Sequence, residues 1–130
     1  MSGSTWRWLS FRSVLAIHAE QIAEHGGGSG VRDVALLGSA LARPINLAAY
    51  GTPDAATVAA AYAYGLARNH PFVDGNKRTA FVAAVTFLLR NGCDLDAAEP
   101  DVALTFVELA AGRMTEEALA SWSRERMAPS

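Results

Sequence analysis

The stretch NHPFVDGNKRTAFVAAVTFLLRNG, residues 69–92, decides the fold because it joins a polar segment directly to the most apolar segment of the chain. Up to Arg78 it contains a histidine, an aspartate, an asparagine and two cations. Over residues 80–89, only Thr86 interrupts a run of apolar residues. Ten helical residues span about 15 Å, half of what a bilayer crossing requires, so the run predicts a buried helix and no membrane partner.

The composition indicates a single globular domain over residues 1–130. The chain is 51% hydrophobic and 18% charged, and a disordered chain would contain far fewer apolar residues. The net charge of −2 gives no global field that would recruit nucleic acid or an anionic membrane. The single cysteine, Cys93, excludes an internal disulfide and a cysteine-based zinc site, which suits a cytoplasmic location. The N-terminus has no apolar region of the kind found in secretory signals.

Helical periodicity between glycine and proline positions predicts an all-α fold, a compact bundle of about six helices without a strand run. Ser10 can cap a first helix that ends at HGGGSG, and Asp33 can start a second helix that Pro44 stops. Residues 44–53 lack a helical period and are expected to form an ordered loop or flap. CDLDA, residues 93–97, reads as a short extended link. Similar start and stop signals predict four further helices, which begin or end near Asp54, Asn76, Asn91, Pro100, Gly112 and Thr115.

The polar loop before the buried helix carries the parts of a phosphate site. The free N–H groups and the dipole of a helix N-terminus attract anions, and Gly75 lets the backbone approach an anion closely. Lys77 and Arg78 lie in the first turn, where the dipole disfavours cations unless an anion is bound. Asn76 can cap the helix or donate to a phosphate oxygen.

The residues just before this phosphate site predict a base and a metal ligand. Asp74 is a hard oxygen ligand, and beside a phosphate such a ligand usually indicates a bridging Mg²⁺ ion. His70 can accept a proton near neutral pH, and Pro71 and Phe72 are expected to hold the loop against the core. These are the parts for phosphoryl or nucleotidyl transfer. His70 and Asp74 also have structural alternatives: His70 can order a turn, and Asp74 can cap a helix or pair with Arg78.

The loop resembles the core motif of the Fic/Doc superfamily, His-x-Phe-x-Asp/Glu-Gly-Asn, then Gly or Lys, then Arg. Lys77 and Phe81 stand where Fic adenylyltransferases usually carry Gly and a second Arg, and NKRTA is similar to the death-on-curing (Doc) toxins of bacterial toxin–antitoxin modules. LAIHAEQIAEHGG, VRDVALLGSALARP and FLLRNG also look Doc-like, so the resemblance covers nearly the whole chain. Six residues match the motif in place: His70, Phe72, Asp74, Gly75, Asn76 and Arg78.

The resemblance implies a toxin of a type II module that transfers phosphate from ATP, with Mg²⁺, to a Ser/Thr hydroxyl of a translation factor such as elongation factor Tu, arresting growth. It implies that His70 is the base, that Asp74 holds magnesium, and that residues 75–78 bind the nucleotide phosphates. Residues 44–53 would be the flap that orients the target backbone. A Phd-like antitoxin would neutralise the toxin by laying its C-terminal segment into a groove.

Two other functions stay open at this point. A protein adenylyltransferase would present the α-phosphate of ATP, rather than the γ-phosphate, to the base and the metal. A catalytically inactive relative would act only as a binding module. Lys77 and Phe81 favour the kinase. Many Fic enzymes inhibit themselves through a Ser/Thr-x-x-x-Glu-Gly/Asn segment, and the nearest sequence here, SWSRER from Ser121, ends in Arg126 instead. Inhibition is therefore expected to come from another chain.

Overall fold

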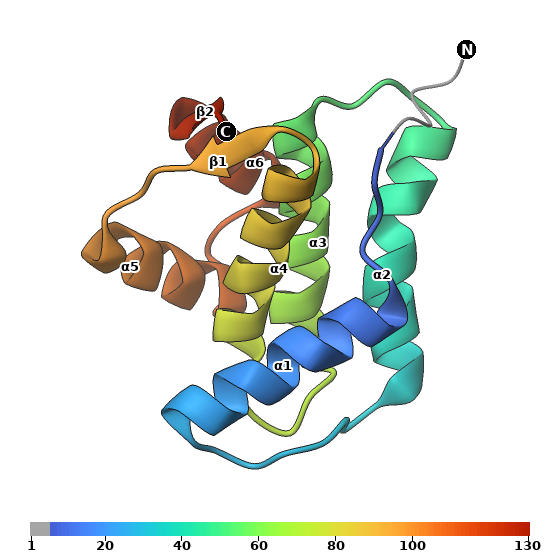
Figure 1. The fold of residues 1–130 in the computed structure, drawn as a ribbon, viewed down its shortest axis with the longest axis vertical. Coiled ribbons are helices and arrows are strands. Elements are labelled where there is room, and N and C mark those ends of the chain that lie inside the picture. Colours follow the sequence, from blue (N-terminus) through green and yellow to red (C-terminus); the bar gives the residue numbers. More distant parts are fainter. Residues whose placement is uncertain (1–5) are drawn as a thin grey trace.

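The computed structural model describes residues 6–130, which form a helical bundle with one two-stranded antiparallel ribbon (Figure 1). The predicted all-α bundle is confirmed, although part of CDLDA pairs as a strand. Residues 1–5 of the N-terminal segment expected to lack a secretory signal lie outside the described part. The elements are α1 (Phe11–His25), α2 (Val34–Ala49), α3 (Ala55–Asn69), α4 (Asn76–Arg90), β1 (Cys93–Leu95), α5 (Glu99–Ala110), α6 (Glu116–Glu125) and β2 (Met127–Pro129).

The centre of the bundle is the antiparallel pair of α3 and α4, joined by the polar loop at one end (Figure 1). Nearly half of the residues of α3 are alanine, so α2, α4 and α6 all pack closely around it. Tyr62 and Phe87 bridge the two central helices with ring centroids 5.3 Å apart, and both are fully buried. The helix predicted over residues 76–91 is thus a rigid core element. Over residues 6–130, no helix has both the length and the apolar character that a bilayer crossing demands.

Pro44 does not stop α2, so that expectation was wrong. The helix runs to Ala49, and Pro44 lies inside it with less than 2% of its surface exposed. Proline normally breaks a helix because it lacks an N–H and crowds the preceding turn. Here the ring is buried, and this tertiary contact outweighs the local preference. Only residues 50–53 form the loop that was expected over residues 44–53.

Gly65 marks the closest approach of α3 to α2. A Cβ atom at this position would lie 3.1 Å from both the Cα and the Cβ of Ala40 and 3.3 Å from its carbonyl oxygen. That carbonyl is the one that Pro44 leaves without a helical donor. The two helix backbones therefore contact each other where neither carries a bulky side chain.

We expect Gly65→Ala to lower the free energy of unfolding by about 1–3 kcal/mol, because the backbone of α2 must move to admit the methyl group. Gly38→Ala is the matched control, since a Cβ there meets nothing within 4 Å. In the helix interior that change should be neutral or stabilising by up to about 1 kcal/mol. Urea unfolding of the two variants measures the difference, and equal stabilities would contradict the close contact.

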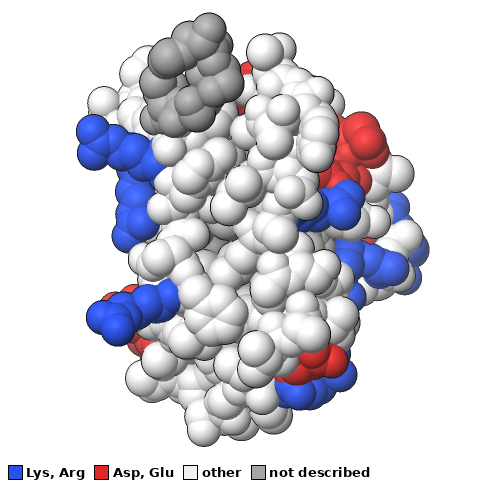
Figure 2. Space-filling view, turned by 90° about the vertical axis from the view of Figure 1, so that its right-hand side faces the viewer, with Lys and Arg blue, Asp and Glu red and all other residues white. Residues whose placement is uncertain are grey.

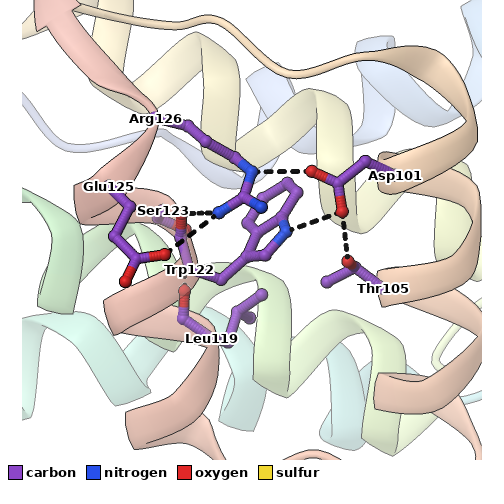
Figure 3. A network of polar contacts seen from close by, with 7 residues as sticks. All are labelled: Asp101, Thr105, Leu119, Trp122, Ser123, Glu125 and Arg126. Carbon is purple, nitrogen blue, oxygen red and sulfur yellow. Dashed lines mark hydrogen bonds and ion pairs between the residues drawn. The ribbon is translucent and has the colours of Figure 1, made fainter.

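A polar network fastens α5 to the C-terminal part of the chain (Figure 3). Asp101 accepts hydrogen bonds from Trp122 Nε1 at 3.1 Å and from Arg126 Nε at 2.7 Å, and the guanidinium of Arg126 lies 4.6 Å from the centroid of the Trp122 ring. The hydrogen bonds from Trp122 and Arg126 hold the pKa of Asp101 below its usual value. This network fixes the position of the segment that leads into β2, away from the polar loop.

A second ion pair ties the start of α3 to α6. Asp54 caps α3 by accepting from the N–H of Thr57 at 2.9 Å, and Arg124 Nε donates to it at 2.7 Å. The hydrogen bond from Arg124 lowers the pKa of Asp54 well below its ordinary range.

Acid should therefore destabilise the fold. Because the folded-state pKa values of Asp54 and Asp101 are depressed, their stabilisation is present above the unfolded-state values and is lost as pH falls below about 4 through the folded values. Urea midpoints measured from about pH 7 down to about pH 2 should decline most steeply below pH 4. Asp54→Asn should flatten that decline, and an unaltered pH profile would exclude this ion pair as a cause.

The outer face of α2 contains few charged side chains (Figure 2). Arg43 is the single charged residue of α2, and it forms an ion pair with Glu116. Tyr50, just beyond the helix, is 91% exposed. This face therefore offers little free positive charge to a phosphate compound.

Candidate active site

The candidate site lies at the N-terminus of α4, where residues 70–75 return the chain from the end of α3. His70 is the C-cap of α3 and has φ 49° and ψ 55°, the left-handed region. Among the described residues it is the only non-glycine with a positive φ. Its side chain is exposed to solvent, so the residue predicted as the base is accessible to a substrate.

Asn76 uses its side chain to hold the loop. Its amide oxygen accepts from the N–H of Phe72 at 3.0 Å, and its amide nitrogen donates to the carbonyl of Phe72 at 3.0 Å. Both residues are buried, Asn76 with 9% exposure. A contribution of Asn76 to phosphate binding, which stays a prediction, would therefore come from its backbone N–H. Pro71 and Phe72 are buried as expected for the support of the loop.

The first turn of α4 keeps its N–H groups free. Gly75 is the N-cap with φ 75°, and no side chain caps this helix. Thr79 is the first residue of α4 whose N–H has an acceptor in the described structure, the carbonyl of Gly75 at 3.0 Å. Residues 76–78 thus present unpaired donors at the positive end of a buried helix, which is the arrangement that binds anions.

Two cations flank these donors without carboxylate partners. In the described part of the chain, neither Lys77 nor Arg78 belongs to an ion pair, and Arg78 makes one long hydrogen bond, 3.4 Å, to the carbonyl of Gly26. Uncompensated positive charge at a helix N-terminus favours a bound anion. A pocket of about 320 Å³ opens at this point, and its walls are His25, Gly26, Gly27, Asp74, Gly75, Asn76, Lys77 and Arg78.

Asp74 is fixed by residues of α1 and of the segment after it. Its Oδ2 accepts from the N–H of Gly28 at 2.7 Å, and its backbone carbonyl lies 2.8 Å from Nε2 of His18. The His18 ring stacks on Phe72 with centroids 3.8 Å apart and planes 6° from parallel. His18 is therefore a supporting residue of the loop. The spacing of residues along α1 gave no signal for that role, because the contact joins residues 56 positions apart.

The donor set fits a magnesium ion only together with a phosphate. No cluster of three or more metal-ligating side chains exists in residues 6–130, and Asp74 is the one carboxylate lining the pocket. Its Oδ1 has no protein partner in the described structure, and Lys77 lies in the same pocket. Magnesium retains several waters and commonly binds through one or two carboxylates plus substrate phosphates.

The segment beside the site is residues 26–31, between α1 and α2. Val31 forms a β-bridge with Phe72, and the N–H of Val73 donates to the carbonyl of Gly30 at 3.1 Å. A Cβ at Gly28 would lie 2.8 Å from Cγ1 of Val73, so the segment approaches the loop closely at this glycine. Residues 44–53, expected to be the flap, precede α3 while His70 follows it. The 15 residues of α3 span about 22 Å, so that assignment was wrong (Figure 1).

A larger, more apolar pocket of about 700 Å³ adjoins the anion pocket between α1, α4 and α5. The two pockets share His25, Lys77 and Arg78. Phe81 lines the larger pocket and packs edge-on against Phe106, with centroids 5.4 Å apart. The position that could have carried a second cation is thus part of an apolar wall.

The chain belongs to the Fic/DOC family, whose model matches residues 8–88, the region that contains the whole loop and its supports. It is 52% identical over 80 residues to Toxin Doc of Mycolicibacterium smegmatis, a match that covers 59% of this chain and 60% of that toxin. It is 33% identical over 119 residues to Protein kinase doc of Escherichia phage P1, covering 91% of this chain and 94% of that protein. The predicted family is confirmed.

Proposed function

We propose that this protein is the toxin of a toxin–antitoxin module and a protein kinase, which transfers phosphate from ATP to a Ser/Thr hydroxyl of a translation factor related to elongation factor Tu. The observation that carries the proposal is the uncapped N-terminus of α4, with the unpaired cations Lys77 and Arg78 beside it and Asp74 and His70 in the same loop. The names of the two relatives, a toxin and a protein kinase, support it.

Each residue of the site has a separate role in the transfer. The N–H groups of residues 76–78, with Lys77 and Arg78, bind phosphate oxygens and stabilise the charge that spreads over them during transfer. Asp74 would hold Mg²⁺ together with oxygens of the nucleotide, and the ion supplies further charge neutralisation there. His70 takes the proton of the target hydroxyl. The hydroxyl oxygen then bonds to the γ-phosphorus as the bond to the bridging oxygen breaks, and ADP leaves.

The target segment is proposed to lie along residues 26–31. This segment is in extended contact with the loop through Val31 and Gly30, and it reaches Asp74 through Gly28. A target chain that docks against it would bring its hydroxyl toward His70. Residues 26–31 thereby take the role of the flap in place of residues 44–53.

The antitoxin is proposed to occupy the apolar pocket between α1, α4 and α5. Its walls include Phe81, Val102 and Phe106, which suit the apolar side of a peptide segment. Because this pocket shares Lys77 and Arg78 with the anion pocket, a peptide placed there would exclude the nucleotide. A Phd-like antitoxin with an apolar C-terminal segment has this chemistry.

The reaction is tested by incubating the purified protein with a bacterial lysate and ATP labelled at the α- or the γ-phosphate. We expect transfer of label to protein from γ-labelled ATP alone. Transfer from α-labelled ATP would identify an adenylyltransferase and contradict phosphate transfer. Growth arrest on expression without transfer of either label would identify a binding module.

A further inference from the structure

Arg32 holds the end of α3 from outside the loop. Its Nε donates to the carbonyl of His70 at 2.7 Å and its Nη2 donates to the carbonyl of Asn69 at 3.0 Å. The backbone N–H groups of Arg32 and Asp33 both donate to the carbonyl of Pro71, at 2.7 and 3.0 Å. Three successive carbonyls around His70 are thus held by two residues that lie at the start of α2.

These contacts stabilise an intrinsically unfavourable backbone conformation at His70. A residue with a Cβ atom is strained in the left-handed region, which glycine or asparagine usually occupies at the end of a helix. Such strain persists only where the surroundings over-determine the conformation. The last carbonyls of a helix also lack intrahelical donors, and a cation is favoured at this end of the dipole. The guanidinium of Arg32 fixes the conformation of His70 by hydrogen bonds. It also supplies donors and positive charge to the last carbonyls of α3.

Other roles for Arg32 find no support in its surroundings. No ion pair of the described chain includes it, so it does not serve to neutralise a carboxylate. Its side chain is exposed, so packing in the core does not explain it. It lines neither the anion pocket nor the apolar pocket beside it. In the described structure its hydrogen bonds lead to the backbone carbonyls of residues 69–71.

We propose that Arg32 is a positioning residue of the active site, which keeps His70 in the left-handed conformation and so keeps the imidazole where it meets the target hydroxyl. The proposal rests on the proposed role of His70 as the base. The side-chain hydrogen bonds of Arg32 lead to backbone carbonyls alone. It acts only through the peptide groups of residues 69 and 70.

Arg32→Met, which keeps the length of the side chain and removes its donors, tests this role. We expect kcat to fall about 10- to 100-fold with KM for ATP unchanged, because the cradle at α4 is untouched while the base is misplaced. Arg32→Lys keeps one donor group and should retain an intermediate kcat. Arg68→Met is the matched control: Arg68 is also exposed and donates to a carbonyl at a helix end, that of Ala110 at 3.2 Å. It should remain within about two-fold of wild type.

Nuclear magnetic resonance supplies a readout that does not depend on catalysis. The backbone carbon shifts and the HN–Hα coupling of His70 report its φ angle, and we expect the left-handed signature in wild type and Arg68→Met but not in Arg32→Met. A retained signature together with an unchanged kcat would overturn the proposal. Equal losses of activity in Arg32→Met and Arg68→Met would also overturn it. If wild type transfers no phosphate, the proposed function fails, while the His70 signals still decide the contact with Arg32.

Discussion

Replacing His70 with alanine is expected to lower phosphate transfer by about 10²- to 10⁴-fold and to leave the affinity for ATP nearly unchanged. The imidazole is exposed at the end of α3 and does not line the anion pocket. Its removal therefore takes away the proton acceptor and leaves the cradle of α4 intact. Steady-state kinetics give kcat, and equilibrium binding of a nucleotide analogue gives the affinity.

His70→Asn separates the chemistry of the imidazole from the backbone conformation. Asparagine tolerates the left-handed region that His70 occupies but cannot act as a base. We expect this variant to be as inactive as His70→Ala. A rate near that of wild type would mean that position 70 matters for the turn alone, and it would contradict the assignment of the base.

Asn76→Ala should lower the free energy of unfolding by about 2–6 kcal/mol and also abolish transfer. The amide of Asn76 satisfies both the N–H and the carbonyl of buried Phe72, and each group left unpaired costs about 1–3 kcal/mol. Without these bonds the loop that carries His70 and Asp74 loses the side-chain contact that fixes it against the start of α4. Denaturant unfolding measures the loss of stability, and γ-labelled ATP measures transfer.

Lys77→Ala is the neighbour that should behave in the opposite way. Lys77 is exposed and has no ion-pair partner among the described residues, so its removal should change stability by less than about 0.5 kcal/mol. It should weaken the binding of ATP, because a cation of the pocket is lost. If Asn76→Ala were as stable as Lys77→Ala, the structural role of the Asn76 amide would be refuted.

Four of the helix starts could be predicted because their signals are local. Each of these helices is capped by a side chain that accepts from the N–H three residues further on, as its position in the sequence indicates. The capping residues are Ser10, Asp33, Asp54 and Thr115. Each contact involves only one turn of chain. The path of α2 through Pro44 depends instead on burial against other helices, which no local pattern records.

The candidate site was predictable to the extent that it is contiguous. His70, Asp74 and Lys77 lie in one loop, so the sequence alone brings them together. The residues that hold the loop in place lie elsewhere in the sequence: His18 and Arg32 are 56 and 38 positions away from the loop residues they contact. The same limit explains the misplaced flap, because the pairing of Val31 with Phe72 is a long-range contact. The direction of the Asn76 side chain, toward Phe72, also required the folded loop.

The central claim, that this site transfers the terminal phosphate of ATP to a translation factor, is tested most directly by intact-mass spectrometry of elongation factor Tu isolated from growth-arrested cells that express the protein. We predict a gain of one phosphoryl group with the wild-type protein and no gain with His70→Ala. A gain of one adenylyl group, or an unmodified factor in arrested cells, would contradict the account.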